Sequence, residues 1–328
     1  MIRASLMMIE LVNKLRSRLD GGLIPAVPVP FDKSGRLHLK AHESYLQYMC
    51  KQPVAGVAVW AHTGRGLLLD EELARTVLRD WRAALGNRVL IAGAGALGAE
   101  TPEEATARSL AMAERAAREG ADALLVYPPT WLRGQAGMDE LIIEHHKRLA
   151  SVGLPLVLFY LYEAAGGISY SQGVLDELLA HPAVIGIKMA TLDSVMTYQD
   201  VSRFLTTRYP DKLLITGEDR FLGYSLRRGA RAALIGMGAV CCAMQAELIS
   251  CHLRGAAERL LSLWDQADLL AESIFIAPLE GYITRLLWSL VHLGVIPLAG
   301  AHDPWGPELP QSEFEELGQT LAALKEIG

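Results

Sequence analysis

The sequence lacks most features that would place the chain outside the ordinary globular proteins. Only four cysteines occur in 328 residues, none with C-x-x-C spacing, so a disulfide framework is not indicated. No wholly apolar run reaches the roughly 20 residues that a membrane-spanning helix requires. Acidic residues outnumber basic ones by 37 to 31, with no Lys/Arg stripe, which argues against nucleic acid as the main partner.

Motifs for metals and nucleotides are also lacking. The histidines have no ligand-spaced partners, and the neighbouring His145 and His146 point apart on a helix. Gly93-x-Gly95 lacks the remaining glycine and the ribose-binding acid of a dinucleotide fingerprint. Charged residues interrupt the N-terminus, so it does not resemble a secretory signal peptide. We therefore expect a cytoplasmic protein that needs neither a metal nor a cofactor and binds no membrane.

What the chain does have is a recurring unit. Runs that are apolar on both faces suit parallel strands covered by helices, and helical periodicity fills the stretches between them. One of the predicted helices, over 102–119, has Thr101 as its N-terminal cap, Pro102 in its first position and Gly120 just after its end. The first seven runs start 29 to 35 residues apart and the last follows after 19, at Leu23, Val54, Val89, Ala121, Leu154, Ala183, Lys212 and Arg231.

Eight strand-and-helix units in about 220 residues predict a (β/α)8 TIM barrel, with a doubly wound open sheet as the rival. The expected organisation is an N-terminal helix over 1–20, the barrel over 21–241 and a C-terminal helical region over 242–328. The N-terminal helix should pack on the barrel or on a neighbouring subunit. Its apolar side is expected to comprise Ile9, Val12, Leu15 and Leu19.

Lys188 is the first candidate for chemistry. In a TIM barrel the active site lies at the C-terminal ends of the strands, and Lys188 ends the sixth apolar run. The preceding residues, 184–187, carry no charge, so apolar walls should lower the pKa of the lysine, as a Schiff-base lysine requires. The alternative is a structural lysine that pairs with a carboxylate such as Glu218.

A series of ordered motifs carries a family resemblance. The motifs are Pro28-x-Pro30-Phe31-Asp32-x-x-Gly35, Thr63-Gly64, Leu69-Asp70-Glu71-Glu72, Ile91-Ala92-Gly93-x-Gly95, Glu119-Gly120-Ala121-Asp122, Gly186-Ile187-Lys188-x-Ala190 and Gly229-Ala230. From about Gly22 to the C-terminal helices, the chain resembles the dihydrodipicolinate synthase / N-acetylneuraminate lyase family. The resemblance implies a (β/α)8 barrel with C-terminal helices, usually in a tetramer. It also implies a Schiff base between Lys188 and a 2-oxo acid, usually pyruvate.

The turn after the second strand departs from the family. The family reads Gly-Thr-Thr-Gly-Glu there, and its hydroxyls and backbone N–H groups hold the substrate carboxylate, whereas this chain reads Ala61-His62-Thr63-Gly64-Arg65. The resemblance therefore assigns carboxylate binding to Thr63 and Gly64. His62 replaces the first threonine, which belongs to a proton relay in the synthases. We expect His62 to act as a replacement general acid/base or to shape the pocket only.

The proton relay of the synthases also contains two tyrosines. In the family the first comes from a Pro-Tyr-Tyr turn of the neighbouring subunit, and this chain has Pro128-Pro129-Thr130 there, so that tyrosine is absent. The other should end the fifth strand. Counting forward from Pro155 gives Phe159 at that position, and counting back from Lys188 gives Tyr160. Tyr160 is accordingly a candidate phenolic acid/base or a residue of the pocket wall.

The positions that would bind a second anionic group are changed as well. The carboxylate-binding arginine of the synthases falls near Ala164 or Ala165, so the bidentate clamp is missing. Condensation of aspartate semialdehyde is therefore not expected. We expect Arg65 either to bind an anionic substrate tail or to pair with Glu163 or Glu218.

Two further features belong to the expected pocket. The turn Gly236-Met237-Gly238 has the small residues that let backbone N–H groups approach an anion, so Gly236 is a candidate substrate-binding residue. An aromatic rim would suit a bulkier or less polar acceptor, although at least two of its members should be ordinary packing residues. The candidates for this rim are Tyr127, Trp131, Phe159 and Tyr162.

These observations predict a lyase or aldolase that acts on a 2-oxo acid together with an aldehyde or sugar acid. Lys188 would form the imine, Thr63 would hold the carboxylate, and Tyr160 or His62 would move the protons. The protonated imine is itself an electron sink, so no cofactor is expected. The protein should form a homo-oligomer, a tetramer or a dimer.

Three alternatives stay open. A dehydratase or deaminase of a sugar-acid or hydroxyproline-derived compound would use the same Lys188. A catalytically silent homologue would bind a 2-oxo acid without forming an imine. A sugar-phosphate isomerase would need Glu218 as a base and a phosphate-binding site at residues 236–238. The lysine motif Gly186-Ile187-Lys188-x-Ala190 argues against this alternative.

Overall fold

The computed structural model describes residues 2–163, 166–192 and 194–327. Its centre is a ring of eight parallel strands in the order β1-β8-β7-β6-β5-β4-β3-β2. The ring closes between the first two strands, where the Ala55 amide donates to Leu23 and the Val27 amide to Ala58. The strands are β1 (Leu23–Pro25), β2 (Gly56–Val59), β3 (Val89–Ala94), β4 (Ala123–Val126), β5 (Leu156–Leu161), β6 (Val184–Ala190), β7 (Leu213–Thr216) and β8 (Ala232–Ile235).

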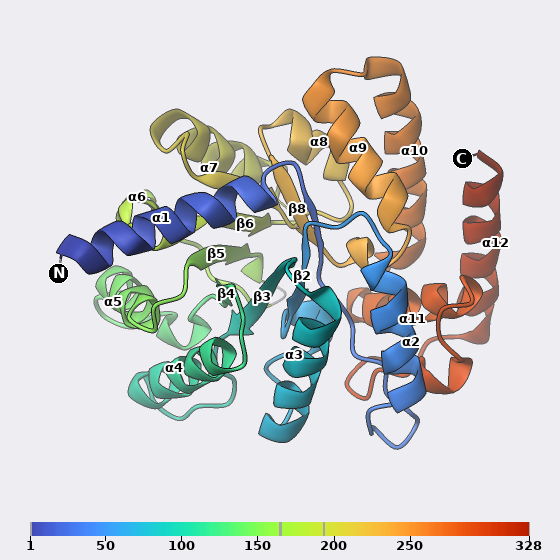
Figure 1. The fold of residues 1–328 in the computed structure, drawn as a ribbon, viewed down its shortest axis with the longest axis horizontal. Coiled ribbons are helices and arrows are strands. Elements are labelled where there is room, and N and C mark those ends of the chain that lie inside the picture. The colour runs from blue at the N-terminus through green and yellow to red at the C-terminus, as the bar shows by residue number, and fades with distance from the viewer. Residues whose placement is uncertain (1, 164–165, 193, 328) are drawn as a thin grey trace.

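Helices follow the strands and form an outer layer around them (Figure 1). The closed ring confirms the expected TIM barrel and excludes the open sheet. Among the described residues no single helix is long and apolar enough to cross a membrane; Ala257–Ile274 and Leu279–His292 meet that test only jointly, bent by 107°. The helices of this layer are α2 (Leu39–Cys50), α3 (Glu71–Leu85), α4 (Pro102–Arg118), α5 (Met138–Ala150), α6 (Gln172–Ala180), α7 (Val195–Arg208), α8 (Leu222–Arg227) and α9 (Cys242–Arg254).

Helix α4 has the ends that its sequence predicts. The Thr101 hydroxyl accepts a hydrogen bond from the Glu104 amide at 3.1 Å, which satisfies one of the free N–H groups of the first turn. Pro102 occupies the first helical position, where its missing N–H costs nothing. Gly120 follows the helix with φ +88°, a conformation that favours glycine.

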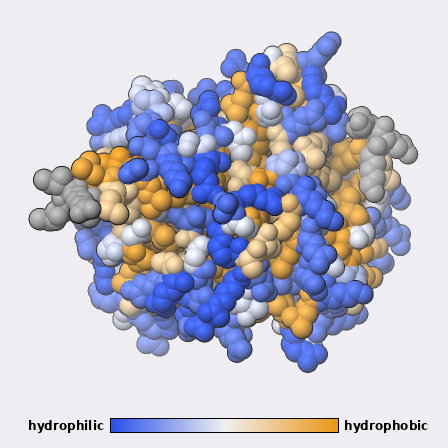
Figure 2. All heavy atoms as spheres, in the orientation of Figure 1, coloured by the Kyte–Doolittle hydropathy of each residue, from blue (hydrophilic) through white to orange (hydrophobic). Residues whose placement is uncertain are grey.

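Helix α1 (Ile2–Leu19) crosses the N-terminal end of the barrel, as Figure 1 shows. Val12, Leu15 and Leu19 are buried among inward-facing strand residues such as Val89. Ile9 is 41% exposed, because it lies on the N-terminal half of the helix, which extends beyond the barrel end. Packing of this half on a neighbouring subunit stays a prediction. Apolar atoms are exposed in this part of the molecule in Figure 2.

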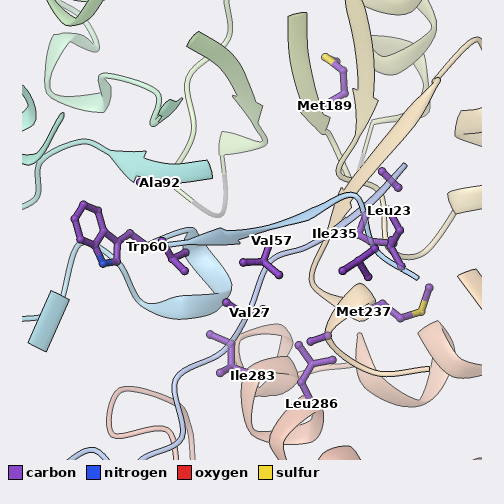
Figure 3. Close-up of a cluster of buried hydrophobic side chains, with 14 of the residues drawn as sticks. Leu23, Val27, Val57, Trp60, Ala92, Met189, Ile235, Met237, Ile283 and Leu286 are labelled. Carbon is purple, nitrogen blue, oxygen red and sulfur yellow. The ribbon is translucent and has the colours of Figure 1, made fainter. Parts of the chain in front are cut away.

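Three helices follow α9 and gather on one side of the barrel: α10 (Ala257–Ile274), α11 (Tyr282–His292) and α12 (Gln311–Ile327). Helix α9 packs against β1, and α11 joins the main core. Figure 3 shows Ile283 and Leu286 of α11 close to Val27 and Met237 of the barrel. The division at residue 242 stays a prediction. The packing of α11 brings the segment before it over the C-terminal ends of the strands.

Side chains along each strand alternate between two buried regions, as the pleat of a strand requires. On β5, Val157, Phe159 and Leu161 belong to the cluster inside the barrel. Leu158 and Tyr160 belong to the larger cluster between the sheet and the helices. This alternation decides which strand residues reach the site.

Candidate active site at the C-terminal ends of the strands

Lys188 lies inside the barrel near the end of β6 and is only 6% exposed. Its Nζ stands 4.2 Å from the centroid of the Phe159 ring, its neighbour in register on β5. Gly217 leaves room for the lysine stem, because a Cβ there would lie 2.6 Å from the Lys188 Cε. The strand and its neighbours therefore fix the amine at the mouth of the barrel, as the sequence predicts.

The surroundings of Lys188 favour the free amine. Burial lowers its pKa from 10.5 to about 8, although the nearby carboxylates of Asp219 and Glu218 act in the opposite direction. At pH 7.5 about a quarter of such an amine is unprotonated, against roughly one part in a thousand at the ordinary pKa. Only the unprotonated amine can attack a carbonyl group.

The two carboxylates after β7 both accept hydrogen bonds from backbone amides. Glu218 is fully buried and accepts hydrogen bonds from the Thr191 amide at 2.6 Å and the Leu192 amide at 3.0 Å. Asp219 accepts from the Met237 amide at 2.7 Å and also lines the cavity around Lys188. Burial raises the pKa of Glu218 to about 7 and that of Asp219 to about 6.

These contacts correct two expectations. Glu218 pairs neither with Lys188 nor with Arg65, and among the described residues it is not part of the cavity wall around the lysine. The Met237 amide in the turn after β8 already binds Asp219, so it is not available to a phosphate. A sugar-phosphate isomerase that uses Glu218 as base therefore has no support in the structure.

Thr63 is held by a residue that the sequence analysis missed. It lies in the short 3-10 turn η1 (His62–Gly64) after β2 and is buried. The Tyr282 hydroxyl donates to Thr63 Oγ1 at 3.1 Å. Tyr282 begins α11 and stacks on Phe275, with ring centroids 4.9 Å apart. A side chain from the C-terminal helices thus fixes the hydroxyl that is expected to hold the substrate carboxylate.

The two glycines predicted to bind substrate have other roles. The Gly64 amide donates to the Ala61 oxygen at 3.0 Å within the 3-10 turn, so it is not free to bind a carboxylate, contrary to expectation. Gly236 does line the cavity, but as a space-saving residue. A Cβ at Gly236 would lie 3.2 Å from both Thr63 Oγ1 and Tyr282 Cε2.

His62 and Arg65 are joined by a shared carboxylate. Glu280, in the turn η5 (Leu279–Gly281), lies 3.5 Å from His62 Nε2 and 2.7 Å from Arg65 Nη1. The hydrogen bond with His62 and the charge of Arg65 hold the pKa of Glu280 at about 2, despite its partial burial. Arg65 also binds Asp303, with 2.7 Å between Nη2 and Oδ2. The expected partners Glu163 and Glu218 are therefore wrong.

Tyr160 does not line the cavity around Lys188, where a phenolic acid/base would have to lie. It lies on the outer face of β5 and packs edge-on against Tyr170, with ring centroids 5.7 Å apart. Phe159, one residue earlier, points inward and faces Lys188. The β5 residue in register with Lys188 is therefore a ring without a hydroxyl, because one step along a strand exchanges its two faces.

Three cavities open at this end of the barrel. The first, here called the lysine cavity, measures about 40 Å³ and includes Lys188, Thr63, Asp219, Glu280 and Tyr282 in its wall. The second, here called the side cavity, measures about 200 Å³ and lies between the segments that follow β2, β3, β4 and β5. His62 and Leu161 line both the lysine cavity and the side cavity. The third cavity measures about 210 Å³, lies between the segments that follow β5 and β6, and shares Leu161 and Tyr162 with the lysine cavity. Its wall is more polar than that of the side cavity, with hydroxyl groups and Glu163.

The expected aromatic rim is only partly present. Phe159 and Tyr162 line the lysine cavity, and Tyr127 lines the side cavity. Trp131 lines neither among the described residues; it packs edge-on against His145, with ring centroids 5.2 Å apart. Ala164 and Ala165, at the position of the synthases' arginine, lie outside the described residues. No group of three or more potential metal-ligating side chains occurs in the described segments.

Residues 20–324 match the sequence model of the Dihydrodipicolinate synthetase family, and the chain belongs to this family. The 4-hydroxy-tetrahydrodipicolinate synthase of Xanthomonas axonopodis pv. citri is 28% identical over 293 residues, which cover 86% of this chain and 91% of that protein. The protein of the same name from Thermodesulfovibrio yellowstonii is 26% identical over 258 residues, 78% and 83% of the two chains. Family membership makes the chain an enzyme, a lyase of the class I aldolase type.

Solved structures agree with this assignment at the level of the fold. The wild-type sialic acid aldolase of Ruminococcus gnavus superposes with a TM-score of 0.80 at 20% identity, over 94% of this chain and 99% of that one. A prophage protein of the dihydrodipicolinic acid synthase family from E. coli K12, solved with pyruvate, gives 0.81 at 19% identity, over 93% and 98%. The resemblance read from the sequence motifs is thereby confirmed.

Three residues of the site belong to no recognisable sequence motif. Glu280, Tyr282 and Asp303 all come from the C-terminal region, more than 200 residues after η1 in the chain. No motif links them to the turn that they contact. An unpaired charge offered one hint, because an arginine at position 65 of a buried turn needs an acidic partner.

Proposed function

We propose that the protein is a lyase or aldolase that binds a pyruvate-like 2-oxo acid as a Schiff base on Lys188. One observation carries the proposal: a buried amine with a depressed pKa stands in a cavity at the C-terminal end of the barrel. The Lys188 amine attacks the keto carbon, water leaves, and the resulting imine takes up a proton. Loss of a proton from the adjacent carbon gives an enamine, whose carbon then attacks an aldehyde.

The remaining residues of the lysine cavity supply binding and charge. Thr63 Oγ1 accepts from Tyr282, so its own proton can be donated to the substrate carboxylate. Asp219 faces the same cavity and would stabilise the positive charge of the protonated imine. In the free enzyme Asp219 has the same effect on the ammonium form of Lys188, because its carboxylate raises the pKa of the lysine.

His62 is the group proposed to move protons. Its ring is partly exposed in the lysine cavity and the side cavity, and an imidazole can donate from one nitrogen while it accepts at the other. Glu280 lies 3.5 Å from Nε2 and would orient the ring. The pair stands in for the relay tyrosines, because Phe159 has no hydroxyl and Tyr160 lies outside the barrel.

The same residues support a reaction other than the lysine-biosynthetic condensation. Phe159, the β5 residue that faces Lys188, has no hydroxyl, and the sequence has alanines where the synthases have their carboxylate-binding arginine. The homo-oligomeric state and the cytoplasmic location remain predictions. The dehydratase, the deaminase and the silent binding protein are alternatives that substrate trapping and turnover distinguish.

The test is reductive trapping of the imine. The protein is incubated with pyruvate and borohydride, and its intact mass is measured by mass spectrometry. We expect one reduced pyruvate adduct per chain, lost in Lys188→Ala and kept in Lys212→Ala, whose lysine is half-buried and lies directly before β7. Absence of an adduct with pyruvate and with other 2-oxo acids would contradict the proposal and favour the silent binding protein.

A further inference from the structure

We propose that the second substrate of this reaction is a neutral, apolar aldehyde that binds in the side cavity. This inference rests on the proposed function, because the aldehyde must meet an enamine formed on Lys188. The side cavity adjoins the lysine cavity through His62 and Leu161, which belong to the walls of both. An acceptor in the side cavity would therefore place its carbonyl group beside the proposed proton carrier.

The wall of the side cavity is mostly hydrocarbon. Leucine side chains from three different segments contribute to it, together with the ring of Tyr127 and with Pro128. Apolar surface of this kind gains free energy when it is removed from water by an apolar ligand. The apolar members of the wall are Leu67, Leu68, Ala96, Leu97, Tyr127, Pro128 and Leu161.

The charges at this site do not suit an anionic acceptor. Among the described residues that line the lysine cavity and the side cavity, the only permanently basic side chains are Lys188 and Arg65. Lys188 is consumed by the imine, and Arg65 is bound by the carboxylates of Asp303 and Glu280. One guanidinium against two carboxylates leaves a net charge of −1, which repels a second carboxylate or a phosphate.

The wall also offers few partners for a sugar-like acceptor. A polyhydroxylated substrate needs several hydrogen-bonding side chains, since each buried hydroxyl without a partner costs free energy. The Tyr127 hydroxyl already donates to the Trp60 oxygen at 2.9 Å. Thr130 is the only other side-chain hydroxyl among the described residues of the side cavity. An aliphatic or aromatic aldehyde fits this wall better than a sugar or sugar acid.

The proposed step conserves atoms and electrons. The enamine carbon forms a bond with the aldehyde carbon, and the aldehyde oxygen takes a proton, from His62 in this account. Water then adds to the imine carbon, the carbon–nitrogen bond breaks, and Lys188 is released as an amine. Pyruvate and the aldehyde are thereby joined into one 4-hydroxy-2-oxo acid, without an oxidant or a reductant.

The experiment compares aldehydes of different chemistry at a fixed concentration of pyruvate. Benzaldehyde and hexanal represent the apolar class, succinic semialdehyde the anionic class and glyceraldehyde the hydroxylated class. The 4-hydroxy-2-oxo acid products are quantified by mass spectrometry, and kcat/KM is measured for each aldehyde. We expect at least one apolar aldehyde to exceed both polar ones by tenfold or more.

A pair of leucine variants locates the binding site. Leu97→Arg places a cation on the exposed rim of the side cavity, and Leu261→Arg makes the same change on α10, far from the barrel mouth. In Leu97→Arg the ratio of kcat/KM for benzaldehyde to that for succinic semialdehyde should fall at least fivefold. In Leu261→Arg this ratio should stay as in the wild type, and pyruvate trapping should be unchanged in both.

The outcomes separate this inference from the proposed function. Equal or faster turnover of succinic semialdehyde or glyceraldehyde by the wild-type enzyme would overturn the apolar acceptor and leave Lys188 chemistry intact. Trapping of pyruvate without turnover of any aldehyde would also overturn it. An unchanged ratio in Leu97→Arg would remove the acceptor from the side cavity. Failure to trap pyruvate at all would contradict the proposed function itself.

Discussion

At the residue scale, the reactivity of Lys188 depends on its burial rather than on a neighbouring base. The amine lies over the Phe159 ring and beside the bare backbone of Gly217, where water cannot surround an ammonium group. Asp219 limits the effect, since its carboxylate favours the charged form. The balance of burial and charge leaves the pKa at about 8, close to the pH at which most enzymes act.

The pH dependence of imine formation follows from this pKa. Because only the free amine reacts, the rate of adduct formation with pyruvate should rise about tenfold per pH unit below about 8 and level off above it. The measurement is the rate of borohydride-trapped adduct between pH 6 and pH 10.5. A rate that keeps rising through the whole range would indicate a solvated lysine and contradict the account.

Tyr282 should act through the residue that it positions. Tyr282→Phe removes the hydrogen bond to Thr63 Oγ1 and keeps the ring stacked on Phe275. A hydrogen bond of this kind contributes about 0.5–1.5 kcal/mol, so KM for pyruvate should rise about 2- to 13-fold while kcat changes less. Tyr198→Phe is the matched control, since Tyr198 is also buried but donates to the Ser225 oxygen in the outer layer. A fall in kcat with unchanged KM would assign Tyr282 to proton transfer instead.

The residue scale also shows where sequence reasoning succeeds and fails. The place of Lys188 at the mouth of the barrel could be predicted, because the apolar residues before it mark the end of a strand. Tyr160 could not be told from Phe159, because a shift of one residue lies within the error of any count along the chain. In a strand that shift moves a side chain from the barrel interior to the outer layer.

At the scale of elements, two ion pairs of Arg65 connect the turn η1 to the C-terminal region. Arg65 joins η1 to Glu280 in η5 and to Asp303 in the segment before α12. Both Arg65 and Asp303 are more than nine-tenths buried. Their pairing fixes the position of Thr63 and His62, which lie in the same turn.

Loss of one partner should therefore destabilise the fold. Arg65→Met leaves the Asp303 carboxylate buried and unpaired, which should cost about 3–5 kcal/mol of the free energy of unfolding, measured in urea. The double variant Arg65→Met/Asp303→Asn should recover part of that loss. Arg203→Met removes an exposed ion pair with Asp200 and should change the free energy of unfolding by less than about 0.5 kcal/mol. A similarly small loss in Arg65→Met would contradict the role given to this pair.

The contacts of η1 explain why half of the site was missed. The strand ends could be searched because the fold fixes where they meet, and that search found His62, Thr63 and Lys188. Glu280 and Tyr282 reach the same place only because α11 packs on the barrel. Helical periodicity predicts α11 as a helix, but no pattern in the sequence states on which surface it packs.

At the scale of the whole molecule, the outer layer contains buried histidines that make stability depend on pH. His145 and His146 of α5 lie between the helices and the sheet, and Nε2 of each has no hydrogen-bond partner among the described residues. Burial lowers the pKa of His146 to about 4 and that of His145 well below its usual range. Both are neutral in the folded protein, whereas in the unfolded chain they bind protons below pH 6.5.

Acid should therefore lower the free energy of unfolding of the wild-type protein more than that of a variant without His146. The pKa of His146 is lower in the folded state, so its contribution to stability is complete above pH 6.5 and declines as the pH falls toward 4. Between pH 7.5 and pH 5 the loss from this residue amounts to about 2 kcal/mol. In His146→Gln the free energy of unfolding should fall by that much less over the same interval. Parallel curves for the two proteins would contradict the prediction.

The overall fold was the part most open to prediction. Each strand is buried on both faces, by helices on one side and by the barrel interior on the other. The strands are therefore apolar throughout and can be recognised in the sequence as regularly spaced apolar runs. The length of the chain then permits a closed ring. The N-terminal helix was predicted as an element, but its exposed Ile9 was not, because the position at which the helix passes the barrel edge depends on tertiary packing.

The most direct test of the account is to locate the trapped pyruvate within the chain. The full-length protein is reduced with borohydride in the presence of pyruvate, digested, and its peptides are sequenced by tandem mass spectrometry. The account predicts the adduct on Lys188 alone, at the end of β6. An adduct on Lys212 or on a surface lysine, with Lys188 unmodified, would contradict it.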